Sequence, residues 1–219
     1  MKILLTILCA GLFVATAFGQ ERYVKPVDEA SQDASFLAFR TKLIAAAERR
    51  DMNYVIGILD PKAELSYGGH VGLKGFRQLW KNEAEFWDEF LPVIKNGGRF
   101  VKDSGLPHPM FAAPYVFTEF PEDLDSFEHF MIFGSDVNLR KEPNTTAEVV
   151  TKLSFNVIKL HEDSKPVGDR ERPEWYRVKT LGGQEGYVSR RYFRSPIDYR
   201  AGFEKKRGVW KMTYFISGD

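Results

Sequence analysis

Apolar side chains in the first half of the chain recur with the period of an α-helix. Over residues 36–47 this pattern predicts an amphipathic helix. Asp33 or Ser35 is placed to cap its N-terminus. The cations Arg49 and Arg50 follow its C-terminus, where positive charge suits the helix dipole. The apolar positions are Phe36, Phe39, Leu43, Ile44 and Ala47.

A second, shorter helix is predicted over residues 52–59. It should stop at Asp60, because a residue that precedes proline is restricted away from helical dihedral angles. Residues 62–69 then alternate between apolar and polar side chains as a strand does, up to a pair of glycines. We therefore expect a helix and then a strand in this part of the chain.

Helical spacing returns over residues 73–80 and continues to Ile94. Pro92 should kink or stop the later helix, since a proline inside a helix removes a backbone hydrogen bond. From residue 99 prolines and aromatic residues become frequent. This change predicts irregular chain followed by a strand at residues 115–120.

The second half of the chain is rich in short β-strand patterns. They follow one another at 8–12 residue spacing, which is typical of a small barrel or sandwich. The tail predicts a last hairpin, with a turn at residues 206–208 and alternating Trp210, Met212 and Tyr214 on one arm. Together with the helices this predicts an α+β fold. The strand patterns are "HFMIFG", "VNLR", "EVVTKLS", "NVIKLHE", "WYRVKT" and "GYVS".

The N-terminus, residues 1–19, has the pattern of a secretory signal peptide. Lys2 precedes an apolar run, and the small residues Ala17 and Gly19 follow it. Cys9 is the single cysteine and lies inside this segment, so the mature chain would contain no disulfide. We expect export to the periplasm or the extracellular space, no transmembrane anchor after signal removal, and a flexible polar lead at residues 20–34.

Charge and motifs exclude several classes of function. The chain has 31 Lys and Arg against 30 Asp and Glu, whereas nucleic-acid-binding domains usually carry a basic excess. Its four histidines lack the spacing of a metal site, and no G-x-S-x-G motif is present. We therefore expect no nucleic-acid partner, no catalytic residues, no metal and no cofactor.

Four motifs in order give residues 135–194 a family resemblance. They are "VNLRKEP", "EVVTKLSFNVIKL", "WYRVKT" and "GYVSRRYF". This segment resembles the bacterial SH3 (SH3b) family, although its charged loop at residues 165–174 is longer than the family usually shows. The resemblance implies a small β-barrel, common in exported bacterial proteins. It also implies that the ligand is peptidoglycan or an envelope peptide.

A second resemblance concerns residues 35–134 together with the tail at residues 195–219. Their layout, with "SYGGH", "GLKGFRQLW" and "GVWKMTYF", is similar to the NTF2-like fold. It implies that the barrel is inserted and that the tail hairpin completes the sheet of the first domain.

An NTF2-like fold would also imply a pocket between sheet and helices. Glu64, Tyr67 and His70 would line it in a small-molecule-binding protein or an enzyme. We prefer a plainer interpretation of these residues, in which His70 is an exposed turn residue after two glycines.

Aromatic and basic residues near the end of the barrel are candidates for a ligand surface, because they suit peptide or glycan recognition. Alternation along the strand places Trp175 with Arg177 on one face and Tyr176 with Val178 on the other, so at least half of the aromatics should be core. We expect a non-catalytic binding module whose partner is a cell-wall peptide or glycan, or an envelope protein. The candidates are Trp175, Tyr176, Tyr187, Arg190, Arg191 and Tyr192.

Overall fold

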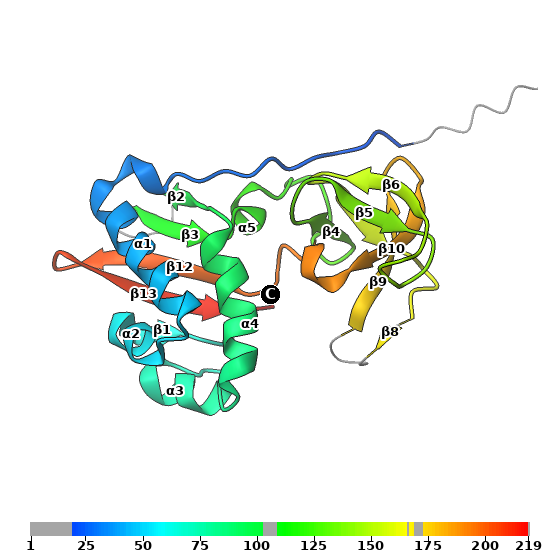
Figure 1. The fold of residues 1–219 in the computed structure, drawn as a ribbon. Coiled ribbons are helices and arrows are strands. Elements are labelled where there is room, and N and C mark those ends of the chain that lie inside the picture. The colour runs from blue at the N-terminus through cyan, green and yellow to red at the C-terminus, as the bar shows by residue number, and fades with distance from the viewer. Residues whose placement is uncertain (1–18, 103–108, 166, 169–172, 219) are drawn as a thin grey trace, which may run out of the picture.

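A computed structural model describes residues 19–102, 109–165, 167–168 and 173–218. Two units lie side by side in it (Figure 1). The first, here called the α+β unit, is formed by residues 30–119 and 197–218, and the second, the β unit, by residues 129–194. Most of the predicted signal segment and part of the loop at residues 165–174 lie outside the described residues.

In the α+β unit a mixed sheet is covered by helices. Within the described residues its strand order is β1-β13-β12-β3-β2, with β1 and β13 parallel and the other pairs antiparallel. The elements are η1 (Ala30–Gln32), α1 (Ala34–Glu48), α2 (Met52–Ile58), β1 (Leu59–Glu64), α3 (Gly72–Leu79), α4 (Glu83–Lys95), β2 (Arg99–Val101), β3 (Met110–Ala113), α5 (Tyr115–Glu119), β12 (Arg200–Lys206) and β13 (Val209–Ile216).

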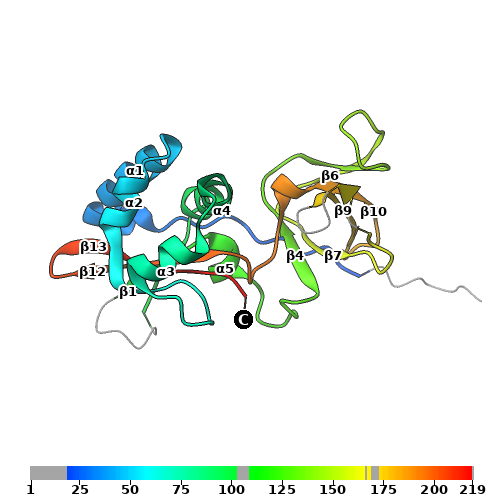
Figure 2. The ribbon, with the colours of Figure 1, turned by 90° about the horizontal axis from the view of Figure 1, so that it is seen from below.

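The predicted amphipathic helix forms as α1. The Asp33 carboxylate accepts hydrogen bonds from the backbone N–H groups of Ser35 and Phe36, so Asp33 is the N-cap residue. Phe36 and Leu43 lie on the buried face of the helix. Helices α1 and α4 lie on the same side of the β12–β13 hairpin (Figure 2), so they cover one face of the sheet.

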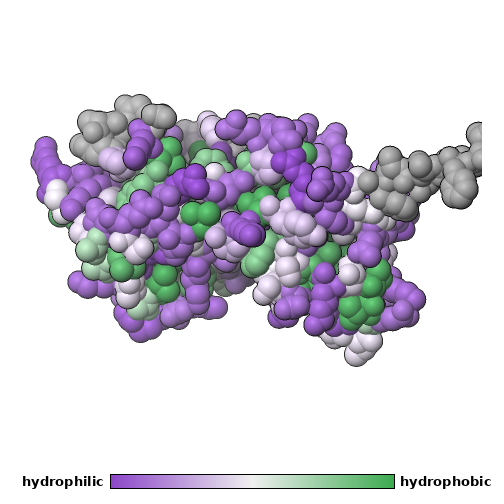
Figure 3. Space-filling model, turned by 90° about the horizontal axis from the view of Figure 1, so that it is seen from above, coloured by the Kyte–Doolittle hydropathy of each residue, from purple (hydrophilic) through white to green (hydrophobic). Residues whose placement is uncertain are grey.

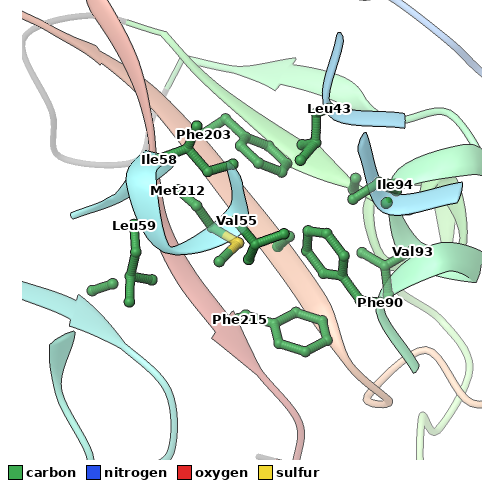
Figure 4. Close-up of a cluster of buried hydrophobic side chains, with 14 of the residues drawn as sticks. Leu43, Val55, Ile58, Leu59, Phe90, Val93, Ile94, Phe203, Met212 and Phe215 are labelled. Atoms are coloured by element: carbon green, nitrogen blue, oxygen red, sulfur yellow. The ribbon is translucent and has the colours of Figure 1, made fainter. Parts of the chain in front are cut away.

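Apolar side chains fill the space between these helices and the sheet. Phe90 and Ile94 from α4 meet Phe203 from β12 and Phe215 from β13 in the close-up (Figure 4). All four side chains are at least nine-tenths buried. This interior is therefore a packed core, held together by burial of apolar surface.

The β unit is antiparallel throughout. Its strand order within the described residues is β11-β4-β7-β9-β10-β5-β6, with β8 paired to β9. Val137, Leu139, Val178 and Val188 form the centre of its small core. The strands are β4 (His129–Ile132), β5 (Val137–Arg140), β6 (Val149–Leu153), β7 (Val157–Leu160), β8 (Val167–Gly168), β9 (Pro173–Thr180), β10 (Glu185–Ser189) and β11 (Phe193–Arg194), and η2 (Arg190–Tyr192) precedes the last.

The α+β fold class predicted from the sequence is confirmed. Strand β4 precedes residue 135, where the predicted barrel begins, and joins the β unit by pairing with β7 and β11. Along the described ranges, no helix is long and apolar enough to cross a membrane.

One predicted element is wrong. Residues 115–120 were expected to form a strand, but Tyr115–Glu119 form the short helix α5. Tyr115 and Val116 are both buried in a third apolar cluster, so the pattern there is not an alternation. Pro92 was expected to kink or stop its helix; α4 does not stop there but continues to Lys95. Burial of its apolar face outweighs the lost hydrogen bond.

The lead at residues 20–34, which the sequence predicts to be flexible, makes specific contacts with both units. Tyr23 forms a β-bridge with Asn156 in the β unit, and Val24 is buried. Asp28 bridges to Gly98 and pairs with Arg40 at 2.6 Å in the α+β unit. Figure 1 shows this segment running along both units.

Candidate functional site

A cleft of about 860 Å³ lies between helix α4 and the β unit. Figure 3 shows the two units as separate lobes with a notch between them. Helix α4 contributes Asp88, Glu89 and Pro92 to one wall. The opposite wall comes from the β unit and is formed mainly by Phe130, Trp175, Tyr176, Arg190, Arg191 and Phe193.

Three aromatic rings stack along the β-unit wall. The centroids of Tyr176 and Phe193 lie 4.0 Å apart with an interplanar angle of 17°, and those of Phe193 and Phe130 lie 4.6 Å apart at 26°. Burial raises the pKa of the Tyr176 hydroxyl; Arg190 lowers it to a smaller extent, while Asp198 and Glu89 raise it further. Tyr176 therefore stays a neutral phenol at neutral pH. The stack offers a flat apolar surface with one hydroxyl.

Both Trp175 and Tyr176 line the cleft, although they are neighbours within strand β9. Strand β7 pairs with β9 only from Val178 to Thr180, and the short strand β8 pairs with β9 at Trp175. Tyr176 packs against the core of the β unit, whereas Trp175 belongs to none of the buried clusters and is only half-buried. The expected alternation holds, and the cleft reaches around the strand to both faces.

Most of the charge in the cleft is already paired. Glu89 on α4 lies 3.0 Å from Arg190 and 3.4 Å from Arg194, which joins the two units by ionic contacts. Arg191 differs from both. It is exposed, its guanidinium carbon lies 4.5 Å from the centre of the Tyr192 ring, and no carboxylate among the described residues pairs with it. Arg191 is thus a cation that a ligand can reach.

The structure brings together Trp175, Tyr176, Arg190 and Arg191, but not the other two predicted candidates. Tyr187 pairs in register with Arg140 and Arg177, away from the cleft lining. Tyr192 packs against the core of the β unit.

Two further residues of the cleft, Phe130 and Glu89, were not among those predicted from the sequence. Phe130 lies on the same strand face as the buried Ile132 and packs against the core of the β unit, so the pattern of "HFMIFG" marks a core residue and does not indicate the element across the cleft. Glu89 lies on the other unit, and no sequence pattern connects it with the arginines of "SRRYFR".

The alternative pocket residues do not form one site. His70 Nδ1 lies 2.8 Å from Ser66 Oγ, and the His70 carbonyl accepts from Leu65 N, so His70 is held within a turn. Glu64 and Tyr67 line a second cleft, of which His70 is not part. Among the described residues, no group of three or more His, Cys, Asp or Glu is placed to hold a metal ion.

One segment of the chain matches a known protein family. Residues 135–194 match the family described as bacterial SH3 domain, as the resemblance of the sequence predicted. The matched segment covers strands β5 to β11 and contributes most of the β-unit wall of the cleft. Searches of curated proteins and of solved structures found no match. The NTF2-like resemblance therefore stays a prediction.

Proposed function

We propose, from the premise that residues 135–194 are a bacterial SH3 domain, that the protein is an exported, non-catalytic binder of peptidoglycan. The peptide part of the cell wall would occupy the cleft between helix α4 and the β unit. An envelope protein is the other partner class, and the experiment below distinguishes the two.

The observation that carries this proposal is the combination of the aromatic stack with an arginine that no carboxylate of the described residues pairs with. Tyr176, Phe193 and Phe130 provide apolar contact area with a fixed orientation. Arg191 supplies a charge-assisted hydrogen bond to a peptide carboxylate. The volume of about 860 Å³ falls within the range of sites for small ligands and would accept a short peptide.

Co-sedimentation of the mature protein with purified sacculi tests the proposal. The wild type should pellet with sacculi, and Arg191→Ala should weaken the association about tenfold, as expected for loss of one charge-assisted hydrogen bond. Arg49→Ala is the matched control, because Arg49 is also exposed but lies outside the cleft at the end of α1.

Two outcomes would contradict the proposal. Recovery of the wild type in the supernatant at low salt would exclude sacculi as the partner. If the wild type binds and Arg191→Ala binds equally well, the cleft is not the binding site. If the protein does not pellet with sacculi but co-purifies with an envelope protein, that result would favour an envelope protein as the partner.

A further inference from the structure

A second cleft of about 860 Å³ lies on the other face of the five-stranded sheet, away from the core. Ala201, Phe203 and Phe215 point into the core, so their strand neighbours Arg200, Tyr214 and Ile216 lie on the open face, where they line this cleft. Tyr67 comes from the turn after β1, and Phe117 from α5. No residue of this cleft belongs to the cleft beside α4.

Arg200 differs from the other buried arginines. Three arginines are buried among the described residues, each with less than a tenth of its surface exposed. Arg40 has Asp28 at 2.6 Å, and Arg194 has Glu89 at 3.4 Å. Arg200 has no carboxylate within ion-pair distance in the described part of the chain.

The contacts of Arg200 are all with neutral groups. Its Nη2 donates to the Tyr67 hydroxyl oxygen at 2.7 Å, and its Nη1 donates to the Ile197 carbonyl at 3.2 Å. The guanidinium carbon lies 5.0 Å from the centre of the Phe117 ring. Each Nη carries a second N–H, so the guanidinium can still donate to a ligand. A buried cation without an anion is unfavourable, which makes this position a receptor for negative charge.

Two phenol hydroxyls adjoin this cation. The Tyr67 oxygen accepts from Arg200, which leaves its proton free to donate. The Tyr214 hydroxyl has no hydrogen-bond partner among the described residues, and burial raises the pKa of Tyr214, so it remains a donor at neutral pH. Gly202 fixes the place of the Tyr214 ring, since a Cβ at position 202 would lie 2.2 Å from Tyr214 Cε1.

The other residues that line the cleft restrict which anions it can bind. Met110, Phe117 and Ile216 provide an apolar surface beside Arg200. Two exposed carboxylates, Glu64 and Glu122, also line the cleft and disfavour ligands of high negative charge. Of the other cations, Arg99 is paired with Glu119 at 2.9 Å and Lys102 is exposed.

We propose that this open-face cleft binds a small organic monocarboxylate with an apolar body. Arg200 holds the carboxylate, the hydroxyls of Tyr67 and Tyr214 donate to it, and the apolar body lies against Phe117 and Ile216. The site is separate from the proposed peptidoglycan cleft and does not depend on it.

Isothermal titration calorimetry with three probes tests the site. Benzoate combines a carboxylate with an apolar ring, benzyl alcohol keeps the ring without the charge, and inorganic phosphate keeps negative charge without the ring. Benzoate should bind saturably, and the other two should bind at least about tenfold more weakly, because each lacks one of the two interactions. Absence of saturable benzoate binding up to about 10 mM would overturn the proposal. Phosphate binding as strong as that of benzoate would overturn the assignment to a monocarboxylate.

Variants assign the binding to these residues. Arg200→Met should abolish benzoate binding, and Tyr214→Phe, which keeps the ring, should weaken it about fivefold to tenfold. Tyr214→Phe removes only one oxygen atom and should fold, so it still tests the site if Arg200→Met does not fold. Arg191→Ala is the control and should bind benzoate as the wild type does, whereas Tyr214→Phe should still bind sacculi. Unchanged benzoate affinity in Tyr214→Phe and Arg200→Met would place the ligand elsewhere and contradict the proposal.

Discussion

Asp33 determines where helix α1 begins, and its contribution to stability depends on pH. The hydrogen bond from the Ser35 hydroxyl lowers the pKa of Asp33; burial opposes this shift, and the backbone N–H groups of Phe36 and Ser35 add to it. A carboxyl with a lowered pKa in the folded state stabilises the fold above its unfolded pKa. That stabilisation is lost as the pH falls through the lower, folded pKa.

We predict that Asp33→Ala lowers the free energy of unfolding by about 1 kcal/mol at pH 7. The difference from the wild type should shrink in acid, as the pH falls through the lowered pKa of the carboxyl. Urea unfolding at pH 7 and at a series of acidic pH values measures it, and Asp33→Asn, which preserves a capping oxygen, should remain close to the wild type at pH 7. A deficit of Asp33→Ala that stays constant down to pH 2 would contradict this account.

Gly202 tests how tightly the open face of the sheet is packed. Because an added Cβ would lie 2.2 Å from Tyr214 Cε1, Gly202→Ala must displace that ring and should cost about 1–3 kcal/mol. Gly57→Ala is the matched control, since no atom lies within 4 Å of its added Cβ and residue 57 is helical, so it should be neutral or stabilising.

The cost of Gly202→Ala should be recovered largely when Tyr214 is also replaced by alanine, as measured in a double-mutant cycle by thermal unfolding. Equal effects of the two glycine substitutions would show that the ring moves away freely.

At the residue scale the sequence predicted caps and core better than it predicted charged partners. The cap at Asp33 follows from local spacing, and the burial of Phe36 and Leu43 follows from periodicity. Neither the pairing of Glu89 with Arg194 nor the lack of a carboxylate at Arg200 follows from any local pattern. Both depend on segments that are distant along the chain.

At the scale of elements, the hairpin β12–β13 is central to the α+β unit. It lies between β1 and β3 in the strand order, so its removal would leave β1 without a partner strand in the sheet. Its Phe203, Met212 and Phe215 side chains also belong to the core beneath the helices.

We predict that truncation after Pro196 abolishes cooperative unfolding of the α+β unit. The truncation removes the two inner strands β12 and β13 from the sheet and the side chains of these strands from the core. Circular dichroism during thermal unfolding would record the loss of the helical transition. Truncation after Ser217, which keeps both strands, is the control and should melt like the full chain. A helical melting transition that survives truncation after Pro196 would show that the hairpin is dispensable.

Element types were predicted where the periodicity was clear, and the prediction failed where no periodicity was present. Helix α1 follows a long helical pattern, and the side chains of strand β5 alternate strictly between buried and half-buried. Residues 115–120 are a short apolar run, which periodicity alone cannot assign to helix or strand. Pro92 shows a different limit, because a local penalty of about 3 kcal/mol is smaller than what burial of Phe86, Trp87 and Phe90 contributes.

At the scale of the whole molecule, ionic and apolar contacts join the two units. Glu89 contacts Arg190 and Arg194 across the cleft. A third apolar cluster combines Tyr115 and Val116 of α5 with Met131 of β4 and Val24 of the lead. The units should therefore unfold together in the wild type.

We predict that Glu89→Gln lowers stability by about 1–3 kcal/mol, because it leaves the buried Arg194 with a single, more distant carboxylate, Asp198 at 3.6 Å. Calorimetry should show the single transition broaden or split into two. Glu148→Gln breaks an exposed pair with Lys141 and should cost no more than about 1 kcal/mol. If the two variants have the same small effect, Glu89 does not couple the units.

The parallel pairing of β1 with β13 also constrains the order in which a nascent chain can fold. Leu59 lies beside Met212 and Glu64 beside Tyr214, so a strand made early waits for one of the last strands to leave the ribosome. The β unit ends at Arg194, so all its strands precede β12 and β13, and without these two strands the apolar faces of α1 and α4 lack the middle of their sheet. The α+β unit therefore needs both ends of the chain to fold, and the β unit, which lies between β3 and β12 in the sequence, links its two parts.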